Sequence, residues 1–261
     1  MAETRSRQTS RGGESRSGMS LLRSQESEGA MLYDPRRVHQ PDGGLFDTAR
    51  WRAAGALTPT DRGRGGSWFL RPAVLGVAAT TDEWVLRHYK RGGWVARWNP
   101  DRYLWWSEET TRPFRELRMT AAMHAAGLPV PAPVAARYQR VGLHYRADLV
   151  TVRIPGVRTL SAALADWPLS VWTAVGQVLR RLHTAGAWHA DLNAHNIVVA
   201  LPEDAAPQVH VIDWDRGCVL SGGPQRGIHN PWNWESEYEP TAEAPCILWP
   251  VDNLVNQAST K

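Results

Sequence analysis

The polar segment WHADLNAHNIVV, residues 188–199, leaves few possible folds for this part of the chain. It places two histidines, an aspartate and two asparagines directly before an apolar run. The preceding segment SVWTAVGQVLRRLHTAG repeats apolar residues at spacings of three and four, which predicts an amphipathic helix capped by Ser170 and ended by Gly186. A polar turn separates that apolar run from a second one, VHVID, and the two runs together predict a pair of short strands. The polar residues are therefore expected in a loop that is fixed at both ends.

The upstream half of the sequence reads mainly as strands. GALTPTDRGRGGSWFL and EWVLRHYKRGG predict three strands with a glycine-rich turn between the first two. PVPAPVAARYQRVGLHYRADLVTVRIPG predicts two more strands around a Val-Gly turn. Between these groups, Phe114, Leu117, Ala121 and Ala125 recur at helical spacing in residues 107–126, and Gly127 ends the pattern. An antiparallel sheet with one main helix is therefore expected before the polar loop.

These patterns predict an α+β fold. Residues 31–155 are expected to form an N-terminal sheet lobe with one main helix, and residues 156–261 a mainly helical C-terminal catalytic lobe with an irregular end. Residues 1–30 are rich in Ser, Arg, Gly and Glu and poor in large apolar residues, which predicts a disordered tail.

Composition restricts the location and the partners. No segment approaches the roughly 18 consecutive apolar residues of a membrane span, and the first thirty residues lack the apolar segment of a secretory signal. The cytoplasm is therefore the expected compartment. A formal net charge of +4 favours an anionic partner such as a nucleotide, a phosphorylated glycan or an acidic lipid surface. No nucleic-acid recognition motif accompanies this charge, so nucleic acid is not an expected partner.

The spacing H-x-D-x-x-x-x-N, followed by I-D-x-D, is typical of enzymes that transfer a phosphoryl group. Asp191 is the predicted catalytic carboxylate, and His189 is expected to orient the loop. Asn196 and Asp213 offer hard oxygen ligands suited to Mg²⁺. A carboxylate at the end of an apolar strand, as at Asp213, is costly unless a metal or a cation meets it. For an H-x-D triplet alone, a turn aspartate that caps its own backbone would be the favoured explanation, and the interval to Asn196 and the later strand aspartate are what favour phosphoryl transfer.

Two upstream elements supply candidate groups for binding ATP. Gly63, Gly65 and Gly66 lie in a turn between predicted strands, where backbone amides can close over phosphates. On the next strand, Arg87 is predicted to meet the phosphates, because it shares a strand face with the apolar Val85. Lys90 stays open as the alternative cation.

Glu116, on the predicted main helix, is expected to hold this cation in place. The simpler alternatives are that Arg87, Lys90 and Arg91 belong to a solvated basic edge, and that Glu116 is a surface partner of Arg112 or Arg115.

The chain resembles the 3-deoxy-D-manno-octulosonic acid (Kdo) kinases of Gram-negative bacteria from about residue 63 to residue 217. The resemblance rests on GRGGSWF, VLRHYKRGG, DRYLW, FRELR, GLPVPAPVAARY, RADLVTVRIPG, WHADLNAHNI and VIDWDRG. It implies a protein-kinase-like, two-lobed fold that transfers the γ-phosphate of ATP to the 4-hydroxyl of a Kdo sugar on lipid A, with Mg²⁺. It also implies that Asp191 is the catalytic base and that Asn196 and Asp213 are the metal ligands.

The resemblance further implies a peripheral position at the cytoplasmic face of the inner membrane. A basic chain without a predicted span suits an acidic glycolipid acceptor at an anionic membrane surface. The candidate contact surface combines basic residues with tryptophans and comprises Arg87, Lys90, Arg91, Trp94, Arg97 and Trp98. Ordinary packing of the two tryptophans in the fold stays open as an equal alternative. Asp215 and Arg216 continue the family-like D-x-D-R-G, and Arg216 is a candidate partner for a sugar carboxylate.

Two alternatives stay open. Small-molecule kinases of the aminoglycoside or choline type use a similar loop followed by I-D-W, but they lack LRHYKRGG and RADLVTVRIPG. A catalytically silent, kinase-like binding module would fit the irregular sequence after Gly217.

Overall fold

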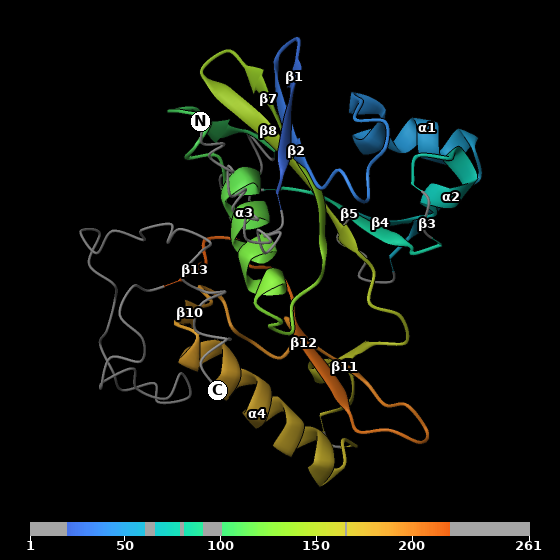
Figure 1. The fold of residues 1–261 in the computed structure, drawn as a ribbon, viewed down its shortest axis with the longest axis vertical. Helices are drawn as coiled ribbons and strands as arrows, with labels where there is room; N and C mark the ends of the chain where they lie inside the picture. Colours follow the sequence, from blue (N-terminus) through green and yellow to red (C-terminus); the bar gives the residue numbers. More distant parts are fainter. Residues whose placement is uncertain (1–19, 61–65, 79–80, 91–100, 165, 220–261) are drawn as a thin grey trace, which may run out of the picture.

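The computed structural model describes residues 20–60, 66–78, 81–90, 101–164 and 166–219 (Figure 1). Its largest element is an antiparallel sheet in the order β1-β2-β7-β8-β5-β4-β3, with β6 paired to β8. The strands are β1 (Leu22–Glu26), β2 (Gly29–Tyr33), β3 (Leu57–Pro59), β4 (Ser67–Leu70), β5 (Trp84–His88), β6 (Tyr103–Leu104), β7 (Pro133–Val141) and β8 (His144–Val152). The predicted N-terminal antiparallel sheet is therefore confirmed.

The hairpin of β7 and β8 forms the middle of this sheet. Val141 pairs with His144, which leaves a two-residue turn in which Gly142 has a φ of 61°. Glycine adopts this left-handed backbone without the steric cost that a Cβ atom brings, so the Val-Gly turn is where the chain reverses.

Helices cover both faces of the sheet. The helical segments here are η1 (Gly43–Phe46), α1 (Thr48–Ala53), α2 (Pro72–Leu75) and α3 (Arg112–Ala125). Successive strand residues point to opposite faces. Ala136 accordingly packs with Phe114 and Leu117 of α3, whereas Ala135 packs with Trp51 of α1. The predicted main helix is thus confirmed, and it lies across the sheet (Figure 1). Of its four pattern residues only Ala125 is exposed.

The N-terminal residues correct the predicted tail. β1 and β2 pair over residues 22–33, so the expectation of a disordered tail over residues 1–30 is wrong for residues 22–30. β2 buries Ala30, Met31 and Leu32 between the sheet's two covering layers. β1, with the sequence LRSQE, is a mostly exposed edge strand, and such a strand has the composition of a tail. The expectation for residues 1–19 lies outside the described residues.

The C-terminal part contains one long helix against short strands. Its elements are β9 (Arg158–Thr159), η3 (Leu160–Ala163), α4 (Leu169–Thr184), β10 (Ala187–Trp188), β11 (Ile197–Ala200), β12 (Gln208–Val211) and β13 (Cys218–Val219). β12, β11 and β9 form one small sheet, and β10 pairs with β13. A mainly helical lobe is not confirmed for residues 158–219, and its predicted end lies outside the described residues.

α4 fixes the position of the polar loop. Its buried face consists of Val171, Val175, Val178 and Leu182, which pack against the apolar residues of β11 and β12. Burial of each such side chain stabilises the fold by about 1.5–3 kcal/mol.

The predicted cap of α4 at Ser170 was wrong. The helix begins at Leu169 after Pro168 and has no side-chain capping bond. Proline's fixed φ suits a helix start, so Ser170 already lies inside the first turn.

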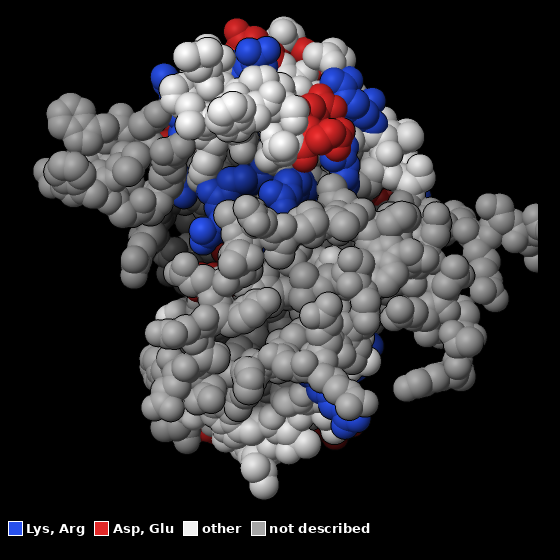
Figure 2. Space-filling view, turned by 90° about the vertical axis from the view of Figure 1, so that its left-hand side faces the viewer, with Lys and Arg blue, Asp and Glu red and all other residues white. Residues whose placement is uncertain are grey.

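Two properties of the described surface bear on partners. Among the described residues, no helix combines the length and apolarity needed to cross a membrane. Figure 2 shows lysine and arginine side chains gathered in a band on one face, beside a group of acidic side chains.

Candidate active site

The loop between β10 and β11 is held by His189. Its Nε2 lies 3.0 Å from the carbonyl oxygen of Ile212, and its Nδ1 accepts a hydrogen bond of 3.1 Å from the backbone N–H of Asp191. A carbonyl oxygen only accepts, so these two partners assign the proton of the neutral imidazole to Nε2. The ring also packs edge-on against Trp214, with centroids 4.7 Å apart. His189 therefore ties the loop to the segment after β12.

Asparagine side chains fix the turn that presents Asp191. The amide nitrogens of Asn196 and Asn193 donate to the carbonyl oxygen of Asp191 over 2.8 Å and 3.1 Å. Asn193 Oδ1 accepts from the backbone N–H of His195. The side chain of Asp191 is exposed, which leaves it open to a substrate. The loop thus holds the backbone of Asp191 and leaves its carboxylate accessible.

Asp213 follows β12 in a strained conformation. Its φ is 64°, in the left-handed region that costs a non-glycine residue on the order of 1–3 kcal/mol. Its carboxylate is 43% exposed and accepts a hydrogen bond from Arg87 Nη1. The predicted need for a cation beside this carboxylate is met here by Arg87.

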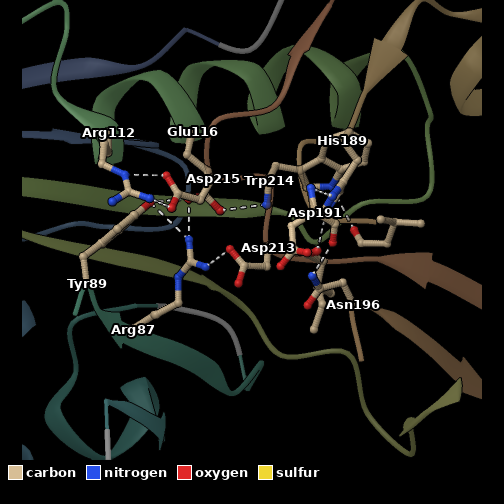
Figure 3. A network of polar contacts seen from close by, with 12 residues as sticks. Arg87, Tyr89, Arg112, Glu116, His189, Asp191, Asn196, Asp213, Trp214 and Asp215 are labelled. Carbon is tan, nitrogen blue, oxygen red and sulfur yellow. Dashed lines mark hydrogen bonds and ion pairs between the residues drawn. The ribbon is translucent and has the colours of Figure 1, made fainter. Parts of the chain in front are cut away.

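Arg87 also reaches α3. Its Nη2 donates to Glu116, which is only 4% exposed, and to the hydroxyl of Tyr89. Tyr89 in turn donates to Glu116 (Figure 3). Burial alone would lower the pKa of Arg87, but Glu116 and Asp213 raise it well above its ordinary value. Burial raises the pKa of Glu116, and Arg87 opposes that shift. Arg87 therefore stays protonated although it is buried, and its Nη1 presents that positive charge to Asp213.

α3 holds the segment after Asp213 from two successive turns. Glu116 Oε1 accepts the backbone N–H of Trp214 over 3.1 Å. One turn earlier, Arg112 Nε donates to Asp215 Oδ1 over 2.8 Å, and its Nη2 donates to Oδ2 (Figure 3). Glu116 is therefore not a surface partner of Arg112 or Arg115, and the simpler alternative for Glu116 is wrong.

A cavity of about 450 Å³ lies between the sheet and the loop. Apolar side chains line it from the large sheet, at Val85, and from β11 and the segment after β12, at Val198 and Ile212. Arg87, Glu116, Asn196 and Asp213 line the same cavity. The structure thus brings together residues that are far apart in the sequence, with apolar walls beside charged groups.

The residues at this cavity fit a magnesium ion that is shared with phosphates. The amide nitrogen of Asn196 is bonded to Asp191, so its Oδ1 is the atom left to bind a cation. With the Asp213 carboxylate this makes two hard oxygen ligands, and Mg²⁺ is usually bound through one or two carboxylates plus substrate phosphates. Within the described ranges no three His, Cys, Asp or Glu residues cluster as metal ligands, so the fit depends on bound phosphates.

The predicted ATP-binding residues are only partly described. Gly63 and Gly65 lie outside the described residues, as do Arg91, Trp94, Arg97 and Trp98 of the expected membrane contact. Gly66 precedes β4, and a Cβ atom there would lie 3.3 Å from the carbonyl oxygen of His88. Lys90 is exposed beside Gly66, whereas Arg87 lines the cavity.

The sequence did not predict three residues of this network: Tyr89, Trp214 and Arg112, which pairs with Asp215. Tyr89 stands two residues after Arg87, so strand alternation could have placed it on the same face. Arg112 lies one helical turn before Glu116, which places both on one side of α3.

This combination of a loop carboxylate, two side chains that offer oxygen atoms to a cation, and a buried ion pair at a cavity is that of a phosphotransferase. More particularly, residues 48–226 match the Lipopolysaccharide kinase (Kdo/WaaP) family, and the chain belongs to that family. Membership makes it a kinase that phosphorylates a sugar hydroxyl.

Relatives extend over most of the chain. The 3-deoxy-D-manno-octulosonic acid kinase of Stenotrophomonas maltophilia (strain K279a) is 42% identical over 192 residues, which are 73% of this chain and 72% of the relative. The enzyme of the same name from Xylella fastidiosa (strain 9a5c) is 40% identical over 193 residues, covering 74% and 73% of the two chains. A solved structure, WaaP in complex with acyl carrier protein, is 17% identical and has a TM-score of 0.42 over 72% of this chain and 73% of that one.

Proposed function

We propose that this protein transfers the γ-phosphate of ATP to the 4-hydroxyl of a Kdo sugar attached to lipid A, during assembly of the lipopolysaccharide core. The observation that carries the proposal is the convergence of Asn196, Asp213 and the Arg87–Glu116 pair on one cavity, beside the loop that presents Asp191. The names of the two relatives support Kdo as the acceptor sugar. A protein-kinase-like, two-lobed division near residue 155 belongs to the same proposal.

The cavity suits ATP in two parts. Its apolar lining residues, among them Val85, Val198 and Ile212, offer a surface for the adenine ring. Arg87 is the cation for the phosphates, because Glu116 and Tyr89 hold its guanidinium from behind. Asn196 and Asp213 would hold Mg²⁺, which neutralises phosphate charge when bound. Lys90 remains the alternative cation, and Gly63, Gly65 and Gly66 are the proposed phosphate turn.

The chemistry proposed for Asp191 is proton removal. The sugar hydroxyl oxygen forms a bond to the γ-phosphorus while the bond between that phosphorus and the β,γ-bridging oxygen breaks, and ADP leaves. The hydroxyl proton passes to the Asp191 carboxylate, which is exposed to the acceptor. His189 acts by holding the loop, through its bonds to Ile212 and to the backbone of Asp191.

The acceptor is tested directly with radiolabelled ATP. The purified chain is incubated with a Kdo-lipid A precursor, an aminoglycoside or choline. Label is expected in the Kdo lipid alone, at the 4-hydroxyl. Transfer to the aminoglycoside or choline alone would replace the proposal with a small-molecule kinase. Binding of ATP without transfer to any acceptor would instead indicate a catalytically silent module.

The same assay tests Asp191. Asp191→Asn is expected to lower kcat by about 10²–10⁴-fold, because a positioned base typically contributes that factor. Its thermal stability should stay near that of the wild type, since the side chain is exposed. Asp204→Asn, at an exposed aspartate in the turn between β11 and β12, is the matched control. An unchanged kcat for Asp191→Asn would assign the base to another residue.

A further inference from the structure

The strained conformation of Asp213 needs support from both sides. On the upstream side, Ile212 donates its N–H to the Asn196 carbonyl over 2.9 Å and accepts from His189. The loop between β10 and β11 therefore holds the residue before Asp213. On the downstream side, the support comes from α3 through the backbone N–H of Trp214 and the carboxylate of Asp215. Asp213 thus lies between two anchors that belong to different parts of the fold.

The downstream anchor is built to hold an orientation. Arg112 meets Asp215 with two nitrogens on two oxygens, a geometry that fixes both side chains in angle as well as distance. The guanidinium lies over the rings of Tyr103 and Tyr89, with its carbon 4.7 Å and 5.8 Å from their centroids. Both partners are largely buried, at 27% and 19% side-chain exposure, so solvent screens the pair less than a surface ion pair.

The segment that carries Asp215 has little freedom to shift. A Cβ atom at Gly217 would lie 2.9 Å from the Met119 methyl and 3.1 Å from the carbonyl oxygens of Trp188 and Trp214. Met119 belongs to α3, and Trp188 ends β10, directly before the loop between β10 and β11. The chain after Asp213 is therefore packed between α3 and that loop, and Arg112 and Glu116 are its charged contacts on α3.

We propose that Arg112 and Asp215 form a positioning pair that sets the direction of the Asp213 carboxylate toward the Mg²⁺–ATP site. The inference rests on the proposed function, in which Asp213 is a metal ligand. Glu116, one turn after Arg112, holds both Arg87 and Trp214. α3 thereby sets the phosphate cation and the metal ligand relative to each other from one rigid surface.

The test measures how the affinity for a non-hydrolysable ATP analogue depends on Mg²⁺, so no acceptor is needed. Arg112→Met and Asp215→Asn are each expected to raise the Mg²⁺ concentration at half-maximal binding by about 10–100-fold, the usual cost of losing a group that orients a metal ligand. Binding of the analogue without Mg²⁺ should change by less than about threefold. The double variant should lose no more than the worse single variant, because both substitutions break one interaction.

Arg118→Met is the matched control. Arg118 lies on the same helix but pairs with the 66% exposed Glu109 at the surface. This variant should keep the wild-type Mg²⁺ dependence. Should Arg112→Met not fold, Asp215→Asn decides, because it is nearly isosteric. Arg112→Lys keeps the charge without the two-nitrogen contact and should give an intermediate Mg²⁺ requirement.

The proposal is overturned if folded Asp215→Asn keeps the wild-type Mg²⁺ requirement, or if the two single losses multiply in the double variant. A loss of thermal stability without a change in Mg²⁺ dependence would show a purely structural role. Absence of phosphate transfer to Kdo by a wild type that binds the Mg²⁺–analogue complex would refute the acceptor and leave this pair's role standing.

Discussion

Arg87 links two acidic residues of the site, Glu116 on α3 and Asp213 after β12. Its guanidinium touches Asp213, Glu116 and Tyr89, and its carbon lies 4.6 Å from the Tyr89 ring centroid. Lys90, three residues later, is exposed. A guanidinium held by a buried carboxylate keeps its direction when ATP is absent, so little ordering is needed when phosphates arrive.

The two candidate cations can be separated by mutation. Arg87→Met should raise the dissociation constant for ATP by about 10–100-fold, because it removes a charge-assisted contact and leaves Glu116 buried without its cation. Lys90→Met should change it by less than about threefold. Calorimetric titration with ATP measures both constants. The reverse order would make Lys90 the phosphate ligand and Arg87 a structural partner of Glu116.

At the level of elements, a charged contact joins the edge strand β1 to the turn before α3, in addition to its pairing with β2. Arg23 donates to both oxygens of Glu108 over 2.7 Å and 2.9 Å, and Tyr138 of β7 donates to the same carboxylate over 2.7 Å. The hydrogen bond from Arg23, aided by Tyr138, lowers the pKa of Glu108. Glu108 therefore joins an edge strand, the turn before α3 and the middle of the sheet.

This contact predicts a defined pH dependence of stability. A carboxylate whose pKa is lowered by folding stabilises the protein above its unfolded pKa of about 4.3, and this contribution is lost as pH falls through the lower folded value. Glu108→Gln should therefore cost about 1 kcal/mol at pH 7, and this cost should shrink steadily as the pH falls below about 4. Urea unfolding across this range measures the difference. Glu109→Gln, at a mostly exposed neighbour, is the control, and a pH-independent cost for Glu108→Gln would contradict the assignment.

Elements with a periodic apolar pattern were predictable from the sequence, and contacts across the fold were not. α3, α4 and the β7–β8 hairpin follow from spacing, because burial of one face imposes the period. β1 was missed because an edge strand buries little and keeps a polar sequence. In the candidate site, Asp191, Asn196 and Asp213 were proposed from their spacing, and the structure places Asn196 and Asp213 at one cavity. The Arg112–Asp215 pair joins residues 103 apart, and no local pattern reports such a contact.

The molecule as a whole is basic, and its acceptor is proposed to lie in a membrane. A net charge of +4 attracts an anionic surface, with each lysine or arginine near that surface contributing about 1 kcal/mol. We propose that the protein is peripheral at the cytoplasmic face of the inner membrane.

Sedimentation with lipid vesicles tests this position. The chain should sediment with vesicles that contain about one third anionic lipid, and about 0.5 M NaCl should release it, because salt screens exposed charges. Vesicles of neutral lipid alone are the control and should bind little. Equal binding to both kinds of vesicle would mean that apolar contacts, and not charge, hold the protein at the surface.

The left-handed backbone at Asp213 also affects how this chain would respond to laboratory evolution. Glycine adopts this conformation without the strain that a Cβ atom brings, so Asp213→Gly should relieve the backbone strain at this position. A screen that rewards only expression or heat resistance would therefore accumulate changes at this codon and select folded protein that has lost its enzyme activity. A library for this protein should be sorted by phosphate transfer from the first round.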